Sequence, residues 1–173
     1  MKQIPILLSV AAIAASIGGA MTVSAADAEH DKSSVIFGGT LPPGYRDWKL
    51  ISVAHEEGSL NDLRAVLGND VAIKAYREGK LPFPDGAIIA RIAWRYVPSE
   101  ENNKVFGHPQ SFVAGPPTNV QFMLKDSQKY ASTGGWVFAQ FSDGKPDEVV
   151  AQACYSCHVP VKARDFIFTR YSP

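Results

Sequence analysis

The run Cys154-Tyr155-Ser156-Cys157-His158, close to the C-terminus, contains residues whose types and spacing can do chemistry. Cys-x-x-Cys-His is the attachment pattern of a c-type haem. The two thiols, about one helical turn apart, add across two vinyl groups at one haem edge, and the histidine that follows gives the iron an imidazole nitrogen. The motif therefore predicts one covalent haem c, bound by Cys154 and Cys157, with His158 as iron ligand.

Two other roles of paired cysteines fit this sequence less well. A thioredoxin-like disulfide between Cys154 and Cys157 would follow a strand in a βαβ unit rather than lie close to the chain end. A zinc site would need two more soft ligands, and the whole chain has only 2 cysteines. Haem attachment is the interpretation that the motif and its context favour.

The N-terminus has the pattern of an export signal. A short basic start, Met1-Lys2-Gln3, precedes an apolar stretch over 4–21, and Val23-Ser24-Ala25 fits a signal peptidase site. An uncleaved membrane anchor is the alternative, but the stretch is rich in small residues and lacks a basic stop-transfer flank. We expect residues 1–25 to be a cleaved signal peptide, with no stable membrane span afterwards. Because bacteria attach haem c outside the cytoplasmic membrane, we expect a periplasmic protein of a Gram-negative bacterium.

The remaining composition limits the organisation and the partners. Residues 26–40 are polar and Gly-rich and are predicted to form a flexible N-terminal arm. Residues 41–173 suit a single domain with one core. The chain has 17 Lys and Arg against 17 Asp and Glu, and Lys2 is lost with the signal. No basic excess remains to bind nucleic acid.

Hydrophobic alternation predicts five strands and no βαβ rhythm. The strongest is 87–97, where Ile88, Ala90, Ile92, Trp94 and Tyr96 share one face. The others lie at 48–55, which reads as buried on both faces, and at 61–67, 119–124 and 136–141. The sequence therefore predicts an α+β domain, mainly an antiparallel β-sheet with a few helices.

Capping residues predict the helices. Asn69-Asp70 begins a helix over 71–78 that Gly79 ends, and a short helical turn is expected over 126–131. Pro146 at a first helical position, with Asp147 and Glu148 in the first turn, begins the helix that carries the haem motif.

No sixth iron ligand stands out. Outside the signal, Met123 is the only methionine, and its place in a strand is typical of a core residue. His30, His55 and His108 lie in predicted arm, loop or strand-end positions, where surface histidines are common. We therefore expect an iron with one open face that binds a small molecule. The alternative is an electron-transfer cytochrome with Met123 or a histidine as sixth ligand.

A series of short motifs precedes and follows the haem motif over most of the mature chain. By their order and spacing, the chain resembles the cytochrome P-460 family, which includes the β-sheet type of cytochrome c′. The motifs are Tyr45-Arg46-Asp47-Trp48, Leu63-Arg64, Arg77-Glu78-Gly79-Lys80, Phe83-Pro84-Asp85-Gly86, Lys125-Asp126-Ser127, Gly135-Trp136-Val137-Phe138 and the tail 165–171.

The resemblance implies a periplasmic homodimer, mainly antiparallel sheet, with a five-coordinate haem and a periplasmic redox partner. Members of the family bind nitric oxide or oxidise hydroxylamine at the open site. The resemblance alone is compatible both with a ligand-binding protein and with an enzyme. The enzymatic alternative is a haem oxidoreductase acting on hydroxylamine, nitric oxide or peroxide.

The resemblance also makes Arg91 a candidate site residue. The hydroxylamine-oxidising members bond a lysine to the haem ring, six residues past the Asp of the Asp-Gly turn, and here that position is Arg91. Arginine stays protonated and offers no nucleophilic lone pair. No lysine lies between Gly86 and Glu101, and Lys74 and Lys80 on the preceding helix have the pattern of solvated lysines. Ligand binding without a crosslink is therefore favoured.

Arg64 and Arg91 are the candidate catalytic residues. Arg64 matches a family arginine near the open face of the haem, where it would hydrogen-bond a ligand; a surface ion pair with Asp62 is the alternative. If the strand face of Arg91 meets the haem, Arg91 pairs with a propionate or polarises a ligand. If that face points outward, Arg91 and Arg95 form a solvated stripe.

Overall fold

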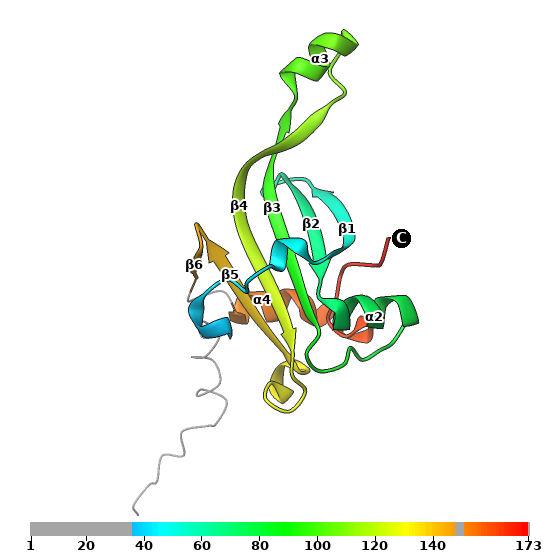
Figure 1. Cartoon of the computed structure of the whole chain (residues 1–173), viewed down its shortest axis with the longest axis vertical. Helices are drawn as coiled ribbons and strands as arrows, with labels where there is room; N and C mark the ends of the chain where they lie inside the picture. The colour runs from blue at the N-terminus through cyan, green and yellow to red at the C-terminus, as the bar shows by residue number, and fades with distance from the viewer. Residues whose placement is uncertain (1–35, 148–150, 173) are drawn as a thin grey trace, which may run out of the picture.

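The computed structural model describes residues 36–147 and 151–172 (Figure 1). Within them, six strands form one antiparallel sheet in which each strand pairs with the next along the chain. This order confirms the mainly antiparallel α+β architecture. The strands are β1 (Lys49–Glu56), β2 (Asp62–Gly68), β3 (Ile88–Pro98), β4 (Phe112–Lys125), β5 (Trp136–Ser142) and β6 (Lys145–Pro146).

Three α-helices and several 3-10 turns connect the described strands. They are α2 (Asp70–Glu78), α3 (Glu100–Phe106), α4 (Ala151–His158), η2 (Tyr45–Asp47), η3 (Ala131–Thr133) and η4 (Val159–Arg164). The predicted caps of α2 are confirmed: the Asn69 side chain accepts a hydrogen bond from the Ala72 N–H, and Gly79 ends the helix with a left-handed φ of 60°.

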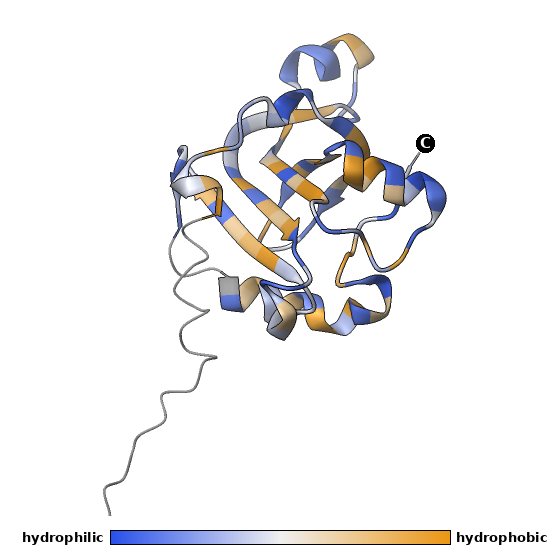
Figure 2. Ribbon diagram, turned by 60° about the horizontal axis from the view of Figure 1, so that its bottom comes forward, coloured by the Kyte–Doolittle hydropathy of each residue, from blue (hydrophilic) through white to orange (hydrophobic). Residues whose placement is uncertain are grey.

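The two faces of the sheet cover two different cores. One face packs against α2, α4 and the C-terminal segment, and its core includes Ile51, Ile73, Trp136 and Phe138. The other face packs against the segment that leads into β1, with Phe122 at its centre. Ile36 and Phe37, in the stretch assigned to the N-terminal arm, join this second core. Figure 2 shows hydrophobic and polar residues alternating along the central strands.

The alternation along β3 settles which of its faces meets which core. Ala90 and Ile92, with Ile88 and Trp94 beside them, pack in the second core, as their predicted common face requires. Ile89 lies in the first core, on the side of α4. Because side chains alternate along a strand, Arg91 points to the same side as Ile89. The face of the sheet that bears Arg91 is therefore the one that α4 covers.

The strands β3 and β4 extend beyond their neighbours as a two-stranded arm with α3 at its tip (Figure 1). The predicted strand 119–124 covers only the second half of β4, and α3 was not predicted. Its signals are nevertheless in the sequence. Ser99 accepts a hydrogen bond from the Asn102 N–H at 3.3 Å, and Gly107 ends the helix with a φ of 77°.

Two local predictions were wrong. The strand at 48–55 is not buried on both faces, because β1 is an edge strand and Ile51 is its only buried residue. Pro146 lies in β6, opposite Phe141, rather than at a helix start. The helical turn expected at 126–131 is present, because the Tyr130 N–H donates to the Asp126 carbonyl at 3.1 Å, and a 3-10 turn follows at Ala131–Thr133.

Asn69 links α2 to the sheet as well as capping the helix. Its Oδ1 accepts from the N–H groups of Ala72 and Ile88, both at 3.0 Å, and its Nδ2 donates to the Gly86 carbonyl at 2.8 Å. We expect Asn69→Ala to lower the free energy of unfolding by about 2 kcal/mol. Chemical denaturation of the intact protein measures this loss.

Ser99→Ala is the matched control, because Ser99 caps the exposed helix α3 with a single hydrogen bond. It should cost about 0.5 kcal/mol, at the lower end for loss of a cap. Equal losses in the two variants would contradict the connecting role of Asn69.

Candidate haem-binding site

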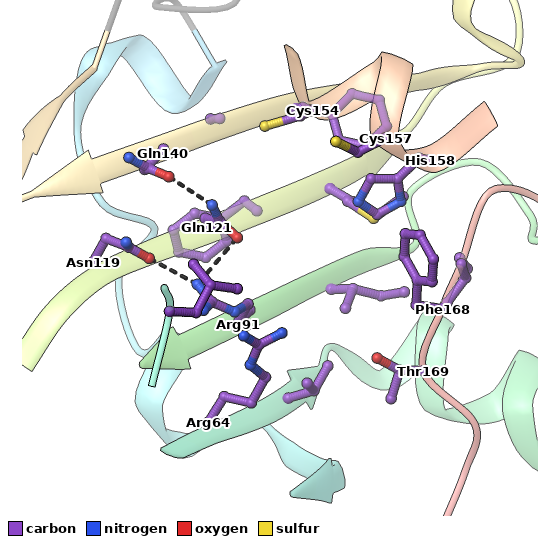
Figure 3. A pocket seen from close by; sticks show the side chains of 18 residues that line it. Arg64, Arg91, Asn119, Gln121, Gln140, Cys154, Cys157, His158, Phe168 and Thr169 are labelled. Atoms are coloured by element: carbon purple, nitrogen blue, oxygen red, sulfur yellow. Dashed lines mark hydrogen bonds between the residues drawn. The ribbon is translucent and has the colours of Figure 1, made fainter. Parts of the chain in front are cut away.

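The five site residues expected from the sequence line one cavity of about 410 Å³ (Figure 3). Helix α4 contributes Cys154, Cys157 and His158. Strand β2 contributes Arg64, and β3 contributes Arg91. In Figure 3 the two thiols and the imidazole lie toward one end of the cavity, while Arg64 and Arg91 lie toward the other.

The imidazole of His158 is oriented by the backbone. Its Nδ1 lies 2.5 Å from the carbonyl oxygen of Phe166 and donates to it, which leaves the Nε2 lone pair for a metal. The rings of Phe138 and Phe168 flank the imidazole, with centroids at 4.9 Å and 5.0 Å. Burial lowers the pKa of His158, and the Phe166 carbonyl offsets this in part. The neutral form, which ligates metals, is therefore favoured at neutral pH.

The two cysteines are free thiols at the cavity wall, Cys154 half-buried and Cys157 exposed. Burial is the larger cause that raises the pKa of Cys154, and the nearby Cys157 is the smaller one. Cys154 therefore stays a thiol at neutral pH. In the described ranges, no group of three or more His, Cys, Asp and Glu side chains is placed to hold a metal ion.

The walls around these three residues are apolar. Val66, Ile89, Met123 and Ile167 line the cavity beside them, and the ring of Phe168 at its rim is 51% exposed. An apolar wall, two free thiols on one helix and one imidazole with a free nitrogen are the groups that a haem c requires. The residues of this cavity therefore fit a haem.

Arg91 is held by polar groups from the two strands that flank β3. Its Nη1 donates to the Asn119 Oδ1 at 2.8 Å and to the Gln121 Oε1 at 3.2 Å, and its Nη2 donates to the Asp62 carboxylate. Burial, together with the charge of Arg64, lowers the pKa of Arg91, while Asp62 opposes this change. Arginine nevertheless remains protonated in proteins. Arg91 is thus a fixed cation at the cavity, whereas Arg95 is exposed.

The ion pair expected between Arg64 and Asp62 is present, and it is largely buried. The Nε and Nη2 of Arg64 donate to the Asp62 Oδ1 at 3.0 Å and 2.8 Å, and Nη1 lies 3.3 Å from Glu56. The residue also lines the cavity. Asp62, only 3% exposed, therefore bridges the two arginines, one on β2 and one on β3.

A row of polar contacts continues from Arg91 across the sheet (Figure 3). Gln121 donates to the Gln140 Oε1 at 2.6 Å, and Gln140 donates to Asp147 at 2.7 Å. Sequence reasoning missed Asn119, Gln121 and Gln140. The signal available in the sequence was the alternation of the polar residues Asn119 and Gln121 in β4. Gln121 pairs in register with Arg91 on one side and with Gln140 on the other. That pairing is visible only once the strands are aligned.

The candidate sixth ligands differ in their positions. Met123 lines the cavity. His55 and His108 do not line it. His55 stacks on Tyr96 with ring centroids 3.8 Å apart, and the Nε2 of His108 lies 2.9 Å from the Gln110 Oε1. His30 lies outside the described residues.

A family model of cytochrome P460 matches residues 42–169, most of the chain. The chain belongs to the cytochrome P460 family. Membership implies a haem cofactor, in agreement with the groups that line the cavity. No curated protein matches the chain. No helix in the described part of this cytochrome P460 has both the length and the apolar character of a membrane span.

The Asp62 carboxylate pairs with two guanidinium groups, so its loss should be severe. We expect Asp62→Asn to lower the free energy of unfolding by about 3 kcal/mol, because it leaves the partly buried Arg91 without a counter-charge and Arg64 with Glu56 alone. Chemical denaturation measures this change.

Asp70→Asn is the control variant, because Asp70 pairs with Lys49 at 2.7 Å on the exposed surface. Exposed pairs contribute little, so the stability of this variant should match that of the natural protein. A loss in Asp62→Asn as small as in the control would show that the bridge is not needed.

Proposed function

We propose that this protein is a periplasmic c-type cytochrome with one covalent haem and a five-coordinate iron that binds small nitrogen oxides such as nitric oxide or hydroxylamine. One observation carries the proposal: among the described residues, His158 is the only histidine that lines the cavity. When bound, the haem supplies an iron that takes up a small ligand and exchanges electrons. Cys154 and Cys157 anchor it, and His158 provides one axial nitrogen.

The position of Met123 supports a core role rather than ligation. Met123 pairs in register with Phe138, whose ring contacts the His158 imidazole. It is only 9% exposed and packs in the same core as Phe138 and Ile167. A thioether packed in this core beside Phe138 would be poorly placed to serve as a second ligand. This argues against the electron-transfer alternative with a methionine ligand.

Arg91 gives the cavity a polar end without a nucleophile. Its guanidinium is held by Asp62, Asn119 and Gln121 and stays charged, so it can stabilise a propionate or a polar ligand. Among the described residues, no lysine lines the cavity. Lys74 lies on α2 with 76% of its side chain exposed, and Lys80 lines a separate, smaller cavity. These positions favour ligand binding over an oxidation that depends on a lysine crosslink.

The proposal includes the processing and assembly of the chain. Residues 1–25 are removed as a signal peptide, 26–40 form the N-terminal arm, and 41–173 form the haem domain. This domain exchanges electrons with a periplasmic partner. The mature protein is a homodimer. The projecting β3–β4 arm supports this assembly, because it exposes a group of large apolar side chains. They are Val105, Phe106, Phe112 and Val113.

The covalent state of the purified protein tests the assignment of Arg91. We expect an intact mass equal to residues 26–173 plus one haem, with no further loss of hydrogen, because arginine does not bond to the ring. Mass spectrometry of the natural protein measures this. A deficit of two hydrogens would instead support the crosslinked, hydroxylamine-oxidising enzyme. As a control, Cys154→Ala combined with Cys157→Ala should lack the mass of the haem.

Carbon monoxide tests the open coordination position. We expect the absorption spectrum of the reduced protein to shift on addition of the gas, because no protein ligand has to be displaced. Met123→Leu, a substitution that nearly conserves volume, should give the same spectra as the natural protein. A low-spin spectrum that is insensitive to the gas in the natural protein, and that becomes sensitive in Met123→Leu, would establish the electron-transfer alternative.

A further inference from the structure

A buried ion pair lies outside the haem cavity, where the proposed function assigns it no role. Lys125, the last residue of β4, places its Nζ 2.7 Å and 3.0 Å from the two carboxylate oxygens of Asp165. The two residues are 4% and 9% exposed. The same Nζ donates to the Gly134 carbonyl at 2.8 Å and lies 4.9 Å from the centre of the Trp136 ring.

Stability alone is a weak reason for such a pair. Removing two charges from water is costly, and well-packed apolar residues in their place are often neutral or stabilising. In several proteins a buried polar or charged group instead specifies one conformation. The relevant question is which part of the backbone this pair holds.

The backbone at Asp165 supplies the answer. Asp165 and Phe166 have successive positive φ angles of 53° and 64°, a conformation that costs free energy for residues other than glycine. The Asp165 carboxylate also accepts a hydrogen bond from the Phe83 N–H at 2.8 Å. The Phe166 N–H donates to the Val161 carbonyl at 3.2 Å. The turn is therefore fixed to β4, to the segment before β3 and to η4.

This turn directs the Phe166 carbonyl toward the haem motif. The carbonyl is the acceptor for the Nδ1 of His158, at 2.5 Å. The two rings that flank the imidazole limit its tilt but make no hydrogen bond to it. Among the described residues, Phe166 is thus the hydrogen-bond partner that determines which nitrogen of His158 is free.

We propose that the Lys125–Asp165 pair positions the axial histidine. The pair holds the left-handed turn, the turn presents the Phe166 carbonyl, and the carbonyl fixes the tautomer and basicity of His158. Lys125 and Asp165 are positioning residues, because neither lines the haem cavity. This inference rests on the proposed function in one respect, namely that His158 ligates the iron.

The test is the iron–histidine bond in the reduced holoprotein, measured by resonance Raman spectroscopy together with the reduction potential. The variants are Lys125→Met, Asp165→Asn and the double variant. We expect the iron–histidine stretching band to broaden and shift to lower frequency in all three. The potential should rise, because a weaker hydrogen bond from Nδ1 leaves less negative charge on the ligand to stabilise ferric iron.

Lys49→Met is the matched control, because it breaks an ion pair of the same length, 2.7 Å, on the exposed surface. It should leave both the band and the potential unchanged. The double variant separates orientation from stability. It leaves no unpaired buried charge, so its unfolding midpoint should recover relative to Lys125→Met while the band stays shifted.

Two results would overturn the inference. The first is an unshifted band in both single variants, with only the unfolding midpoint lowered. The second is a band that recovers together with stability in the double variant. Either result would show that the pair has a purely structural role. If Lys125→Met does not accumulate, Asp165→Asn carries the test, because asparagine keeps an acceptor for the Phe83 N–H. Failure of the proposed function is distinguishable, because the natural protein would then show a six-coordinate, low-spin iron.

Discussion

The alternation of side chains along the paired parts of β2 to β5 is the constraint on which the rest of the structure depends. Each of these strands serves a core with one face and the haem cavity with the other, so a shift by one residue would exchange the two sets. On the cavity face, polarity changes at the same level in β3, β4 and β5. Ile89, Met123 and Phe138 pair at the apolar end, and Arg91, Gln121 and Gln140 pair at the polar end. In β2 the change comes two residues further along, because Val66 lies opposite Arg91 and Arg64 lies opposite Ala93.

This division explains how one sheet suits an amphipathic cofactor. The apolar end lies beneath the helix that carries the thiols and the imidazole, where a macrocycle would be shielded from water. At the polar end, Asp62 accepts hydrogen bonds from both arginines, and the side-chain amide of Asn119 accepts another from Arg91. These contacts offset the cost of partly burying the two cations. Charge and hydrophobicity are thereby separated along the strands rather than across them.

Local chemistry made a large part of the fold and site predictable from the sequence. Three signals each act over a few residues: the caps of α2, the alternation of β3 and the Cys-x-x-Cys-His run. The structure agrees with the caps and with the alternation. It also brings the residues of the motif to one cavity. What the sequence does not reveal is pairing at a distance. β1 reads as a buried strand, yet its edge position exposes it, and Pro146 has the pattern of a helix start, yet it pairs with Phe141. Gln121 and Gln140 join the site only through the sheet register.

Arg91 shows how a single side chain defines what such a cavity can do. A lysine at this position would present one flexible amine, which can lose its proton and attack a ring carbon. Arginine cannot do this, and its planar donors are already directed to Asp62, Asn119 and Gln121 on neighbouring strands. The same contacts that keep the cation partly buried also fix its position. Among the described residues, the polar end of the cavity therefore combines a permanent positive charge with no lysine amine, a combination suited to holding a polar ligand or propionate rather than to bonding the haem ring.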